Sequence, residues 1–339
     1  MKFSTNQQTS RVIILFIFLI LLVMLPLVVT NYYWQHLLIM SLVASVLGMT
    51  FSMIFCCAGM VTLGTGAFIA IGAYASTLLV MKLGLSFWLA LPFAVIITAM
   101  FSFAFGLVAI RNPGVAFVLL TMIFAEIITQ VTGQISFFGG WGGFIMIPRP
   151  NPIGPIKFTG KLPFYYLMLF LCLLVVLVFQ ALYTSRIGKV WRAISLSPHL
   201  AQTVGINVYR YRLLAFVIAS SAAGLAGSFY AHYAQTLAPS TFGGFFSILV
   251  QLYPILGGIN FYILGPALGA TIMTIVPEFL RITKEIEPII TGLLVLIIVL
   301  FYPGGILGSI TQLPRLGAIS ISKRLKEIET WLSNMDPRR

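Results

Sequence analysis

The segment SRIGKVWRAISLSPHLAQTVGINVYRYR, residues 185–212, decides how this sequence is read, because it interrupts a chain that is otherwise almost continuously apolar. It contains five Lys and Arg residues and no acidic residue. A basic, water-soluble segment between two apolar runs of membrane-spanning length is typical of a cytoplasmic loop. We therefore predict that residues 185–212 lie on the cytoplasmic side of a membrane.

This loop also has an internal pattern. Apolar residues recur at three- and four-residue spacing, which predicts a short helix with one apolar face, at Ile187, Val190, Trp191 and Ile194. Pro198 follows, and Gly205 is predicted to end a second short helix with a positive φ angle. Such a pair of helices would form a docking surface, with Trp191 and Ile194 on its apolar face. The alternative is a loop whose charge only fixes topology, but topology alone would require neither Trp191 nor the ordered spacing.

Composition places the chain among polytopic membrane proteins. Hydrophobic residues make up 60% of it and charged residues 8%, whereas a soluble domain has about 25% charged residues. The net charge of +13 does not indicate nucleic-acid binding, because the basic residues lie in short loops and tails between apolar runs, where topology and anionic lipid explain them. The three cysteines lie inside apolar runs without metal-site or disulfide spacing.

We predict about ten membrane-spanning helices, each able or nearly able to cross about 30 Å of hydrocarbon. Their approximate bounds are residues 12–29, 35–56, 61–80, 87–110, 114–133, 163–184, 213–236, 245–258, 261–277 and 288–302. With both termini in the cytoplasm, fourteen Lys and Arg residues fall on the inner side and six on the outer side. That bias has the sign expected for this orientation. The predicted fold is an all-α transmembrane helical bundle.

Two further regions complete the predicted organisation. Residues 1–308 form the transmembrane domain, and residues 134–162 are its largest outer loop, rich in Gly and Pro, with Trp141 and Phe144 available to contact a soluble partner. Residues 309–339 form a basic cytoplasmic tail. Apolar residues at alternating four- and three-residue spacing in this tail predict an amphipathic helix that lies on the membrane surface.

Glycine and threonine cluster between the second and third predicted spans, in CCAGMVTLGTGAFIAIGAY, residues 56–74. Small residues four apart let helices pack closely, and this explains most of the glycines taken singly. The cluster as a whole predicts a helix break at residues 59–66. Irregular backbone at membrane depth survives only where protein or water satisfies it, so Thr62 and Thr65 are candidates for the lining of a solute path.

The fifth predicted span contains Glu126, the only acidic residue before Glu278. A carboxylate within a span costs roughly 2.5–3.5 kcal/mol on insertion scales, so it needs a partner or a protein-lined cavity. One interpretation is a functional group in a path or gate. The other, which we favour because Glu126 lies in the outer half of its span, is a structural carboxylate. Glu126 and Thr121 of the same span are included among the path candidates.

Several catalytic motifs are absent from the sequence. It contains no G-x-x-x-x-G-K-[ST] phosphate loop, so this chain is not expected to bind and hydrolyse ATP by that route. It contains no HExxH or GxSxG motif and no paired intramembrane carboxylates. We therefore predict that the chain is not an enzyme and binds no metal or cofactor.

Between about Gly48 and Gly308 the chain carries an ordered series of short motifs. They are Ala58-Gly59 through Leu63-Gly64 with Phe68 and Gly72-Ala73-Tyr74; Phe117, Thr121 and Phe124-Ala125-Glu126-Ile127; Gly139-Gly140 with Gly142; Ser185, Ile187-Gly188, Arg192-Ala193-Ile194 and Gly205-Ile206; Ala215-Phe216 with Ala223-Gly224-Leu225-Ala226-Gly227; Gly257-Gly258, Gly265-Pro266 and Gly269-Ala270; and Pro303-Gly304-Gly305-Ile306 with Gly308. In order and spacing this series resembles the permease subunits of branched-chain amino acid type ABC importers, a family that includes urea and amide permeases.

The resemblance implies a role for residues 185–212 as the coupling element that inserts into a cleft on an ATPase subunit. The family's coupling motif, glutamate-alanine-alanine followed three residues later by glycine, falls on residues 199–205, and this chain matches it at Ala201 and Gly205. The residues assigned to the coupling loop by this resemblance are Gly188, Trp191, Arg192, Ala193, Ile194, Pro198, Ala201 and Gly205.

The function implied is that of a permease in a bacterial inner membrane that imports branched-chain or other hydrophobic amino acids by alternating access. Its partners would be a homologous second permease, two ATPase subunits that bind ATP and Mg²⁺, a soluble substrate-binding protein and membrane lipid. A permease for urea, amides or another small polar solute is the alternative within the family. A self-sufficient secondary transporter or channel would need ion-coupling charges inside the membrane, and only Glu126 is available. A structural scaffold would show no ATP dependence and no substrate.

Overall fold

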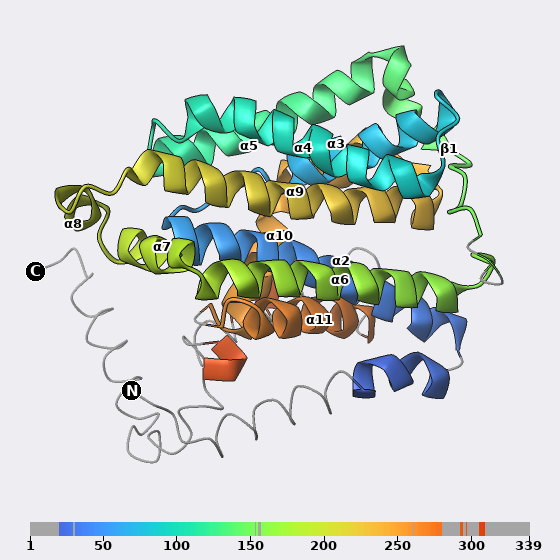
Figure 1. Cartoon of the computed structure of the whole chain (residues 1–339). Coiled ribbons are helices and arrows are strands. Elements are labelled where there is room, and N and C mark those ends of the chain that lie inside the picture. The colour runs from blue at the N-terminus through green and yellow to red at the C-terminus, as the bar shows by residue number, and fades with distance from the viewer. Residues whose placement is uncertain are drawn as a thin grey trace, which may run out of the picture.

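The structure is a computed structural model, which describes residues 20–29, 31–152, 154, 157–259 and 261–279, with residues 292, 293, 296 and 305–308. Part of the first predicted span, most of the tenth and the whole 309–339 tail lie outside the described residues. The described chain is built mainly from helices that run back and forth between two ends (Figure 1). The prediction of an all-α polytopic fold is confirmed.

Residues 20–28 are helical and precede the main elements. The long helices are α2 (Tyr32–Met53), α3 (Thr65–Met81), α4 (Phe87–Ala109), α5 (Val115–Gln134), α6 (Lys161–Thr184), α9 (Val208–Ala234), α10 (Gly244–Gly257) and α11 (Leu264–Phe279). Two short helices, α7 (Arg186–Leu196) and α8 (Pro198–Thr203), connect α6 to α9 and project at one end of the bundle (Figure 1).

Among the described residues, six helices are long and apolar enough to cross a membrane. They are the α2 segment extended to Ala58, α4, α5, α6, α9 and the α10 segment that begins at Pro239. At 17 and 16 residues, α3 and α11 are shorter. The bounds of most helices agree with the predicted spans to within a few residues. The starts of the third and seventh spans differ most: α3 begins at Thr65 and not at residue 61, because residues 59–64 are not helical, and α9 begins at Val208 and not at residue 213.

The helix α2 does not end at Met53 but continues as a five-residue π-helix, η1 (Ile54–Ala58). Gly59 ends it with φ of 62°, in the left-handed region. π-Helices are rare, and short ones within α-helices are frequently found at functional sites. Here the π-turn and the left-handed glycine together turn the chain away from the axis of α2, which confirms the predicted helix break.

The centre of the bundle is formed by α2, α3 and α9, with α6 and α11 beside α2 (Figure 1). The closest approach is between α3 and α9, where a Cβ atom added to Gly72 would lie 2.1 Å from the carbonyl oxygen of Gly224. A Cβ on Gly227 would lie 2.0 Å from the carbonyl oxygen of Ile69. The predicted close crossing of helices at small residues is confirmed for this pair.

The outer loop forms a small β-ladder at the end opposite α7 and α8. Its strand β1 (Phe144–Ile145) pairs antiparallel with β2 (Thr236–Leu237), and the 3₁₀ helices η2 (Ser136–Phe138), η3 (Gly140–Gly142) and η4 (Pro239–Phe242) flank them. The buried His232 of α9 donates from Nδ1 to the carbonyl oxygen of Pro148 at 2.7 Å. Two-residue strands are too short to give an alternating pattern, so the sequence did not predict them.

The glycine-rich sequences ILGGIN, residues 255–260, and GPALGA, residues 265–270, both predict sharp turns between short helices. The first is a turn, since α10 ends at Gly257 and Gly258 has φ of 121°. The second expectation is wrong, because residues 265–270 lie within α11. A Cβ on Gly269 would lie 1.8 Å from the carbonyl oxygen of Tyr253. These glycines therefore allow α10 and α11 to cross closely and do not break α11.

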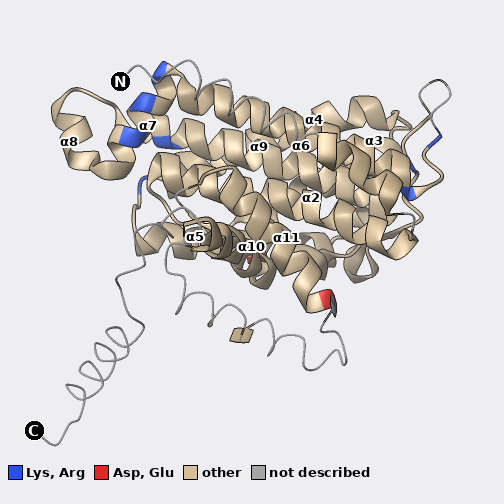
Figure 2. Cartoon of the chain, turned by 90° about the horizontal axis from the view of Figure 1, so that it is seen from below, with Lys and Arg blue, Asp and Glu red and all other residues tan. Residues whose placement is uncertain are grey.

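Charged residues are confined almost entirely to the two ends of the described bundle. Figure 2 shows Lys and Arg gathered at the α7 end and on the outer loop, with a middle region nearly free of them. The α7 end carries Arg186, Lys189 and Arg192, all in one helix. This distribution matches a membrane-spanning orientation of the long helices.

Candidate functional site

The connecting segment, residues 59–64, links η1 to α3. The α2 and η1 helix of 27 residues has a length of about 40 Å, whereas the 17 residues of α3 reach only about 25 Å. Because α3 is shorter than the hydrocarbon layer, we infer that the connecting segment completes this crossing. Non-helical backbone at that depth requires hydrogen-bond partners from the protein or from a water-filled path.

Side chains of two other helices supply those partners. The Leu63 backbone N–H donates to Thr121 Oγ1 of α5 at 3.0 Å, and Gln251 Nε2 of α10 donates to the Thr62 carbonyl oxygen at 3.0 Å. At the start of α3, the Gly66 N–H donates to Ser247 Oγ at 2.8 Å. The Thr62 hydroxyl itself accepts from the Gly64 N–H at 3.1 Å. The connecting segment is thus fixed between α5 and α10.

We predict that Thr121→Val lowers the free energy of unfolding by about 1–3 kcal/mol, because the change leaves the Leu63 N–H without its acceptor. Thr129→Val is the matched control, since the Thr129 hydroxyl donates within its own helix to the Ala125 carbonyl oxygen. Thermal unfolding of the two purified variants measures the difference. Equal midpoints would show that Thr121 does not hold the connecting segment.

The path candidates fall into two groups. Thr62, Thr65 and Thr121 are buried at or beside the connecting segment, and the structure brings Thr62 and Thr121 together through it. Glu126 is exposed on the surface of α5, where Gln130 Nε2 donates to its Oε1 at 3.1 Å. Around Glu126 the exposed side chains of α5 are apolar; they are Leu119, Met122, Ile123 and Ile127.

Sequence reasoning missed Ser247 and Gln251. Both are polar residues inside the predicted eighth span, and their presence in a short, otherwise apolar run was the available signal. Their partners, Gly66 and Thr62, are more than 180 residues away in sequence. No local pattern could have identified these pairs.

The predicted pair of short helices in residues 185–212 is confirmed as α7 and α8. Serine caps begin both of them: Ser185 Oγ accepts from the Gly188 N–H and Ser197 Oγ from the Leu200 N–H, each at 3.4 Å. Pro198 occupies the first turn of α8, where its missing N–H costs nothing. Gly205 has φ of 83°, so the predicted left-handed conformation is also confirmed.

The predicted orientation of the apolar face is wrong. Trp191 and Ile194 are each 0% exposed, so neither can contact another subunit directly. The indole Nε1–H of Trp191 donates to the Tyr211 carbonyl oxygen at 2.9 Å, and Ile194 packs with Ala201 and Val208. Both side chains therefore anchor the loop to the rest of its own chain, because they are buried against apolar residues there.

The surface that α7 and α8 present outward is formed by other residues. Three apolar side chains are strongly exposed: Leu196 at 87%, Val204 at 74% and Leu200 at 69%. We call this set the apolar trio. The exposed basic residues Arg186, Lys189 and Arg192 lie on α7. Of the remaining predicted loop residues, Gly188 and Ala201 are buried and Ala193 and Pro198 are half-buried.

Helix α7 is packed tightly between α6 and η1. A Cβ on Gly188 would lie 2.0 Å from the Tyr183 carbonyl oxygen of α6, and a Cβ on Gly59 would lie 3.5 Å from the Cα of Ser195 in α7. The Arg212 Nε–H, from the start of α9, donates to the Ala58 carbonyl oxygen at the end of η1, at 2.9 Å. Helix α7 therefore contacts the π-helix that leads directly into the connecting segment.

A bundle of apolar helices, a broken helix whose connecting segment is held by polar side chains and a paired-helix loop at one end define a polytopic membrane protein. The comparisons agree with this class. The chain belongs to the family described as the branched-chain amino acid transport system permease component, whose model matches residues 33–302.

Several curated proteins are similar to this chain. The high-affinity branched-chain amino acid transport permease LivM of Salmonella typhimurium is 27% identical over 291 residues, which cover 79% of this chain and 68% of that protein. The LivM protein of Escherichia coli is 26% identical with the same coverage. The nucleoside ABC transporter permease NupC of Lactococcus lactis is 28% identical over 191 residues, covering 51% of this chain and 59% of that protein. No solved structure matches the chain.

Proposed function

We propose that this chain is the membrane-spanning subunit of an ATP-driven importer in a bacterial inner membrane, and that the α7–α8 loop is its coupling element. The observation that carries the proposal is the placement of the α7–α8 loop: the apolar trio is exposed at the end of α7, on α8 and directly after α8, while α7 packs on η1. A movement of α7 imposed by an ATPase that binds ATP and Mg²⁺ would therefore reach the connecting segment through direct contacts.

The solute path is proposed to lie along α5 and the connecting segment, at an interface with a second, homologous permease. Exposed apolar side chains are ordinary for a lipid-facing helix, but the exposed pair Glu126 and Gln130 is costly in lipid. A second subunit that covers this face would provide a protein-lined or hydrated environment for the pair. Alternating access would then be a change in how this face packs against the corresponding face of the second permease.

The proposed substrates are branched-chain or other hydrophobic amino acids. The names of the LivM relatives support this class, whereas the name of NupC refers to nucleosides. The alternative within the family is a small polar solute such as urea or an amide. A soluble binding protein would deliver the substrate at the β1 end, where Trp141, Ile145 and Met146 are exposed.

The coupling proposal is tested by replacing the apolar trio with serine. Burial of a Val or Leu side chain contributes about 1.5–3 kcal/mol, so the loss of three of them from the interface is expected to weaken ATPase binding by at least about thirtyfold. Because the trio is exposed, the stability of the isolated chain should not change. The matched control is Gln202→Ala with Thr203→Ser, two exposed polar positions on α8.

Normal ATPase co-purification by the trio variant, together with native transport, would contradict the coupling proposal. Transport by the chain alone, without ATP, would instead support a secondary transporter or channel. A chain that transports nothing with any partner would support a scaffold.

We predict that Glu126→Gln keeps the chain folded and assembled, since the amide retains hydrogen bonding to Gln130 and removes a charge. Uptake of radiolabelled leucine by the assembled transporter then separates the two interpretations of Glu126. A loss of tenfold or more would assign the carboxylate to the solute path. Unchanged uptake would make Glu126 structural and remove it from the path candidates.

A further inference from the structure

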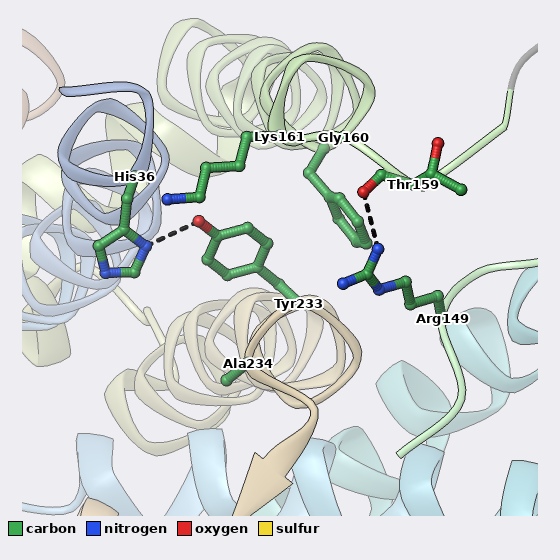
Figure 3. Close-up of a pocket in the computed structure, with 8 residues that line it drawn as sticks. His36, Arg149, Thr159, Gly160, Lys161, Tyr233 and Ala234 are labelled. Carbon is green, nitrogen blue, oxygen red and sulfur yellow. Dashed lines mark hydrogen bonds between the residues drawn. The ribbon is translucent and has the colours of Figure 1, made fainter. Parts of the chain in front are cut away.

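Two neighbouring cavities open at the β1 end of the bundle, between the helix at residues 20–28, α2, α6 and α9. The first has a volume of about 250 Å³ and is lined by polar and basic side chains, which include His36, Arg149, Lys161 and Tyr233 (Figure 3). The second has a volume of about 360 Å³ and is lined by Pro26, Leu27 and Leu162 together with Tyr32 and Gln35. Gly160 and Lys161 line both cavities, so the two adjoin at the start of α6.

The first cavity is built to receive negative charge. None of the described residues that line either cavity is acidic; the nearby carboxylate of Glu278 lies outside the lining and accepts from the Tyr33 hydroxyl. Lys161 Nζ donates to the Tyr32 carbonyl oxygen at 2.8 Å, which fixes the ammonium group in place and uses one of its three N–H donors.

Arg149 is fixed in the same way. Its Nη1 donates to the carbonyl oxygens of Thr159, at 2.7 Å, and Phe158, at 3.4 Å, while its Nη2 donates to Gln235 Oε1 at 3.1 Å. A guanidinium group has five N–H donors, so further donors remain for a ligand. His36 Nδ1 and the Tyr233 hydroxyl pair at 2.7 Å and add polar atoms to the opposite wall (Figure 3).

The second cavity lies between the helix at residues 20–28 and the first turns of α2 and α6. The helix at residues 20–28 is held against α6 by hydroxyl groups, since Tyr165 donates to the Leu22 carbonyl oxygen at 2.8 Å and Tyr166 donates to that of Val23 at 3.2 Å. Leu27 remains more than half exposed. The apolar part of the lining, Pro26, Leu27 and Leu162, is suited to contact an acyl chain.

We propose that the two cavities together bind one anionic phospholipid, with its phosphate in the cavity of Arg149 and Lys161 and an acyl chain along Leu27 and Leu162. A soluble anion would use only the first cavity, and a purely apolar molecule only the second. The exposed aromatic residues Tyr32 and Tyr33 stand beside the site. Tyrosine gathers at the level of lipid headgroups, which is the depth that this assignment requires.

The test is native mass spectrometry of the purified full-length chain, exchanged into equal amounts of phosphatidylglycerol and phosphatidylcholine. The native chain is expected to retain phosphatidylglycerol preferentially. Arg149→Gln with Lys161→Gln should lower that preference about thirtyfold, because each basic residue near a headgroup contributes about fivefold. The matched control is Lys82→Gln with Lys157→Gln, which removes the same charge from the same end outside both cavities.

Two further variants keep the test decisive if the double variant does not fold. Lys161→Arg preserves the charge and is expected to preserve the preference. Leu27→Gln leaves the basic residues in place and should weaken retention of phosphatidylglycerol without changing binding of free glycerol phosphate.

Equal retention of the two lipids by the native chain would overturn the proposal. Displacement of phosphatidylglycerol by an equal concentration of glycerol phosphate would show that the site takes a soluble anion instead. A double variant that loses binding of the soluble substrate-binding protein, but keeps its lipid preference, would assign the basic cavity to protein docking.

Discussion

Replacing Trp191 by alanine is expected to lower the free energy of unfolding by about 3–5 kcal/mol, the usual cost of deleting a fully buried tryptophan. Trp191 is 0% exposed, and its indole N–H bonds the Tyr211 carbonyl oxygen at 2.9 Å. The substitution therefore leaves a cavity between α7 and the bundle and removes a hydrogen bond. Because Trp191 anchors α7 to the bundle, the surface proposed to bind the ATPase should be displaced together with the helix.

Leu200→Ala separates this anchoring role from direct docking. Leu200 is strongly exposed on α8, so its truncation should leave stability unchanged while weakening association with the ATPase. Thermal unfolding and co-purification, measured on both variants, form the pair of readouts. If Trp191→Ala unfolds at the native temperature, Trp191 does not anchor the loop as the structure shows.

The second large effect is expected at the crossing of α3 and α9. In Gly72→Ala the new Cβ would lie 2.1 Å from the Gly224 carbonyl oxygen, and backbone atoms cannot turn aside as a flexible side chain can. The two helices must separate, and overpacking of this kind costs about 1–3 kcal/mol or more. Because the crossing lies at the centre of the bundle, we expect little folded protein to be recovered.

Gly142→Ala is the control for this substitution, since a Cβ there would have no neighbour within 4 Å. The yield of monodisperse protein in detergent and the midpoint of thermal unfolding provide the comparison. Native behaviour of Gly72→Ala would mean that α3 and α9 are farther apart than the structure places them.

The loop at residues 185–212 shows what its sequence can and cannot predict. The spacing of Trp191 and Ile194 correctly predicts a helix with one apolar face, because periodicity is a local property of the chain. The same spacing does not reveal what covers that face. The interior of a bundle and the cleft of a partner subunit are both apolar, so only the structure could show that Trp191 and Ile194 turn inward while Leu196, Leu200 and Val204 turn outward.

The connecting segment gives a second example. Its glycines and threonines predict a helix break, since glycine permits the left-handed turn found at Gly59. The hydrogen bonds that stabilise the break come from Thr121, Ser247 and Gln251, in helices far away in sequence. The position of the break was therefore predictable and its partners were not. For residues 265–270 the glycines predict a turn, but they lie within α11 at a close helix crossing. Glycine is favoured in both settings, so the sequence does not distinguish them.

The central helix α2 has a consequence for how the chain is made. Its neighbours α6, α9, α10 and α11 all follow it in sequence. During synthesis α2 therefore enters the bilayer before these neighbouring helices have been made, and it is surrounded by lipid until they are inserted. Its mean hydropathy of 2.2 allows this.

Its serine and threonine hydroxyl groups allow it too, because each has a partner within the continuous helix formed by α2 and η1. Ser41 Oγ donates to the Leu38 carbonyl oxygen at 2.8 Å, Ser45 Oγ donates to that of Ser41 at 2.6 Å, and Thr50 Oγ1 donates to that of Leu47 at 2.6 Å. Hydroxyl groups bonded in this way need no partner helix while they face lipid. In the finished protein α2 is almost wholly enclosed, yet its side chains remain suited to the membrane through which it enters.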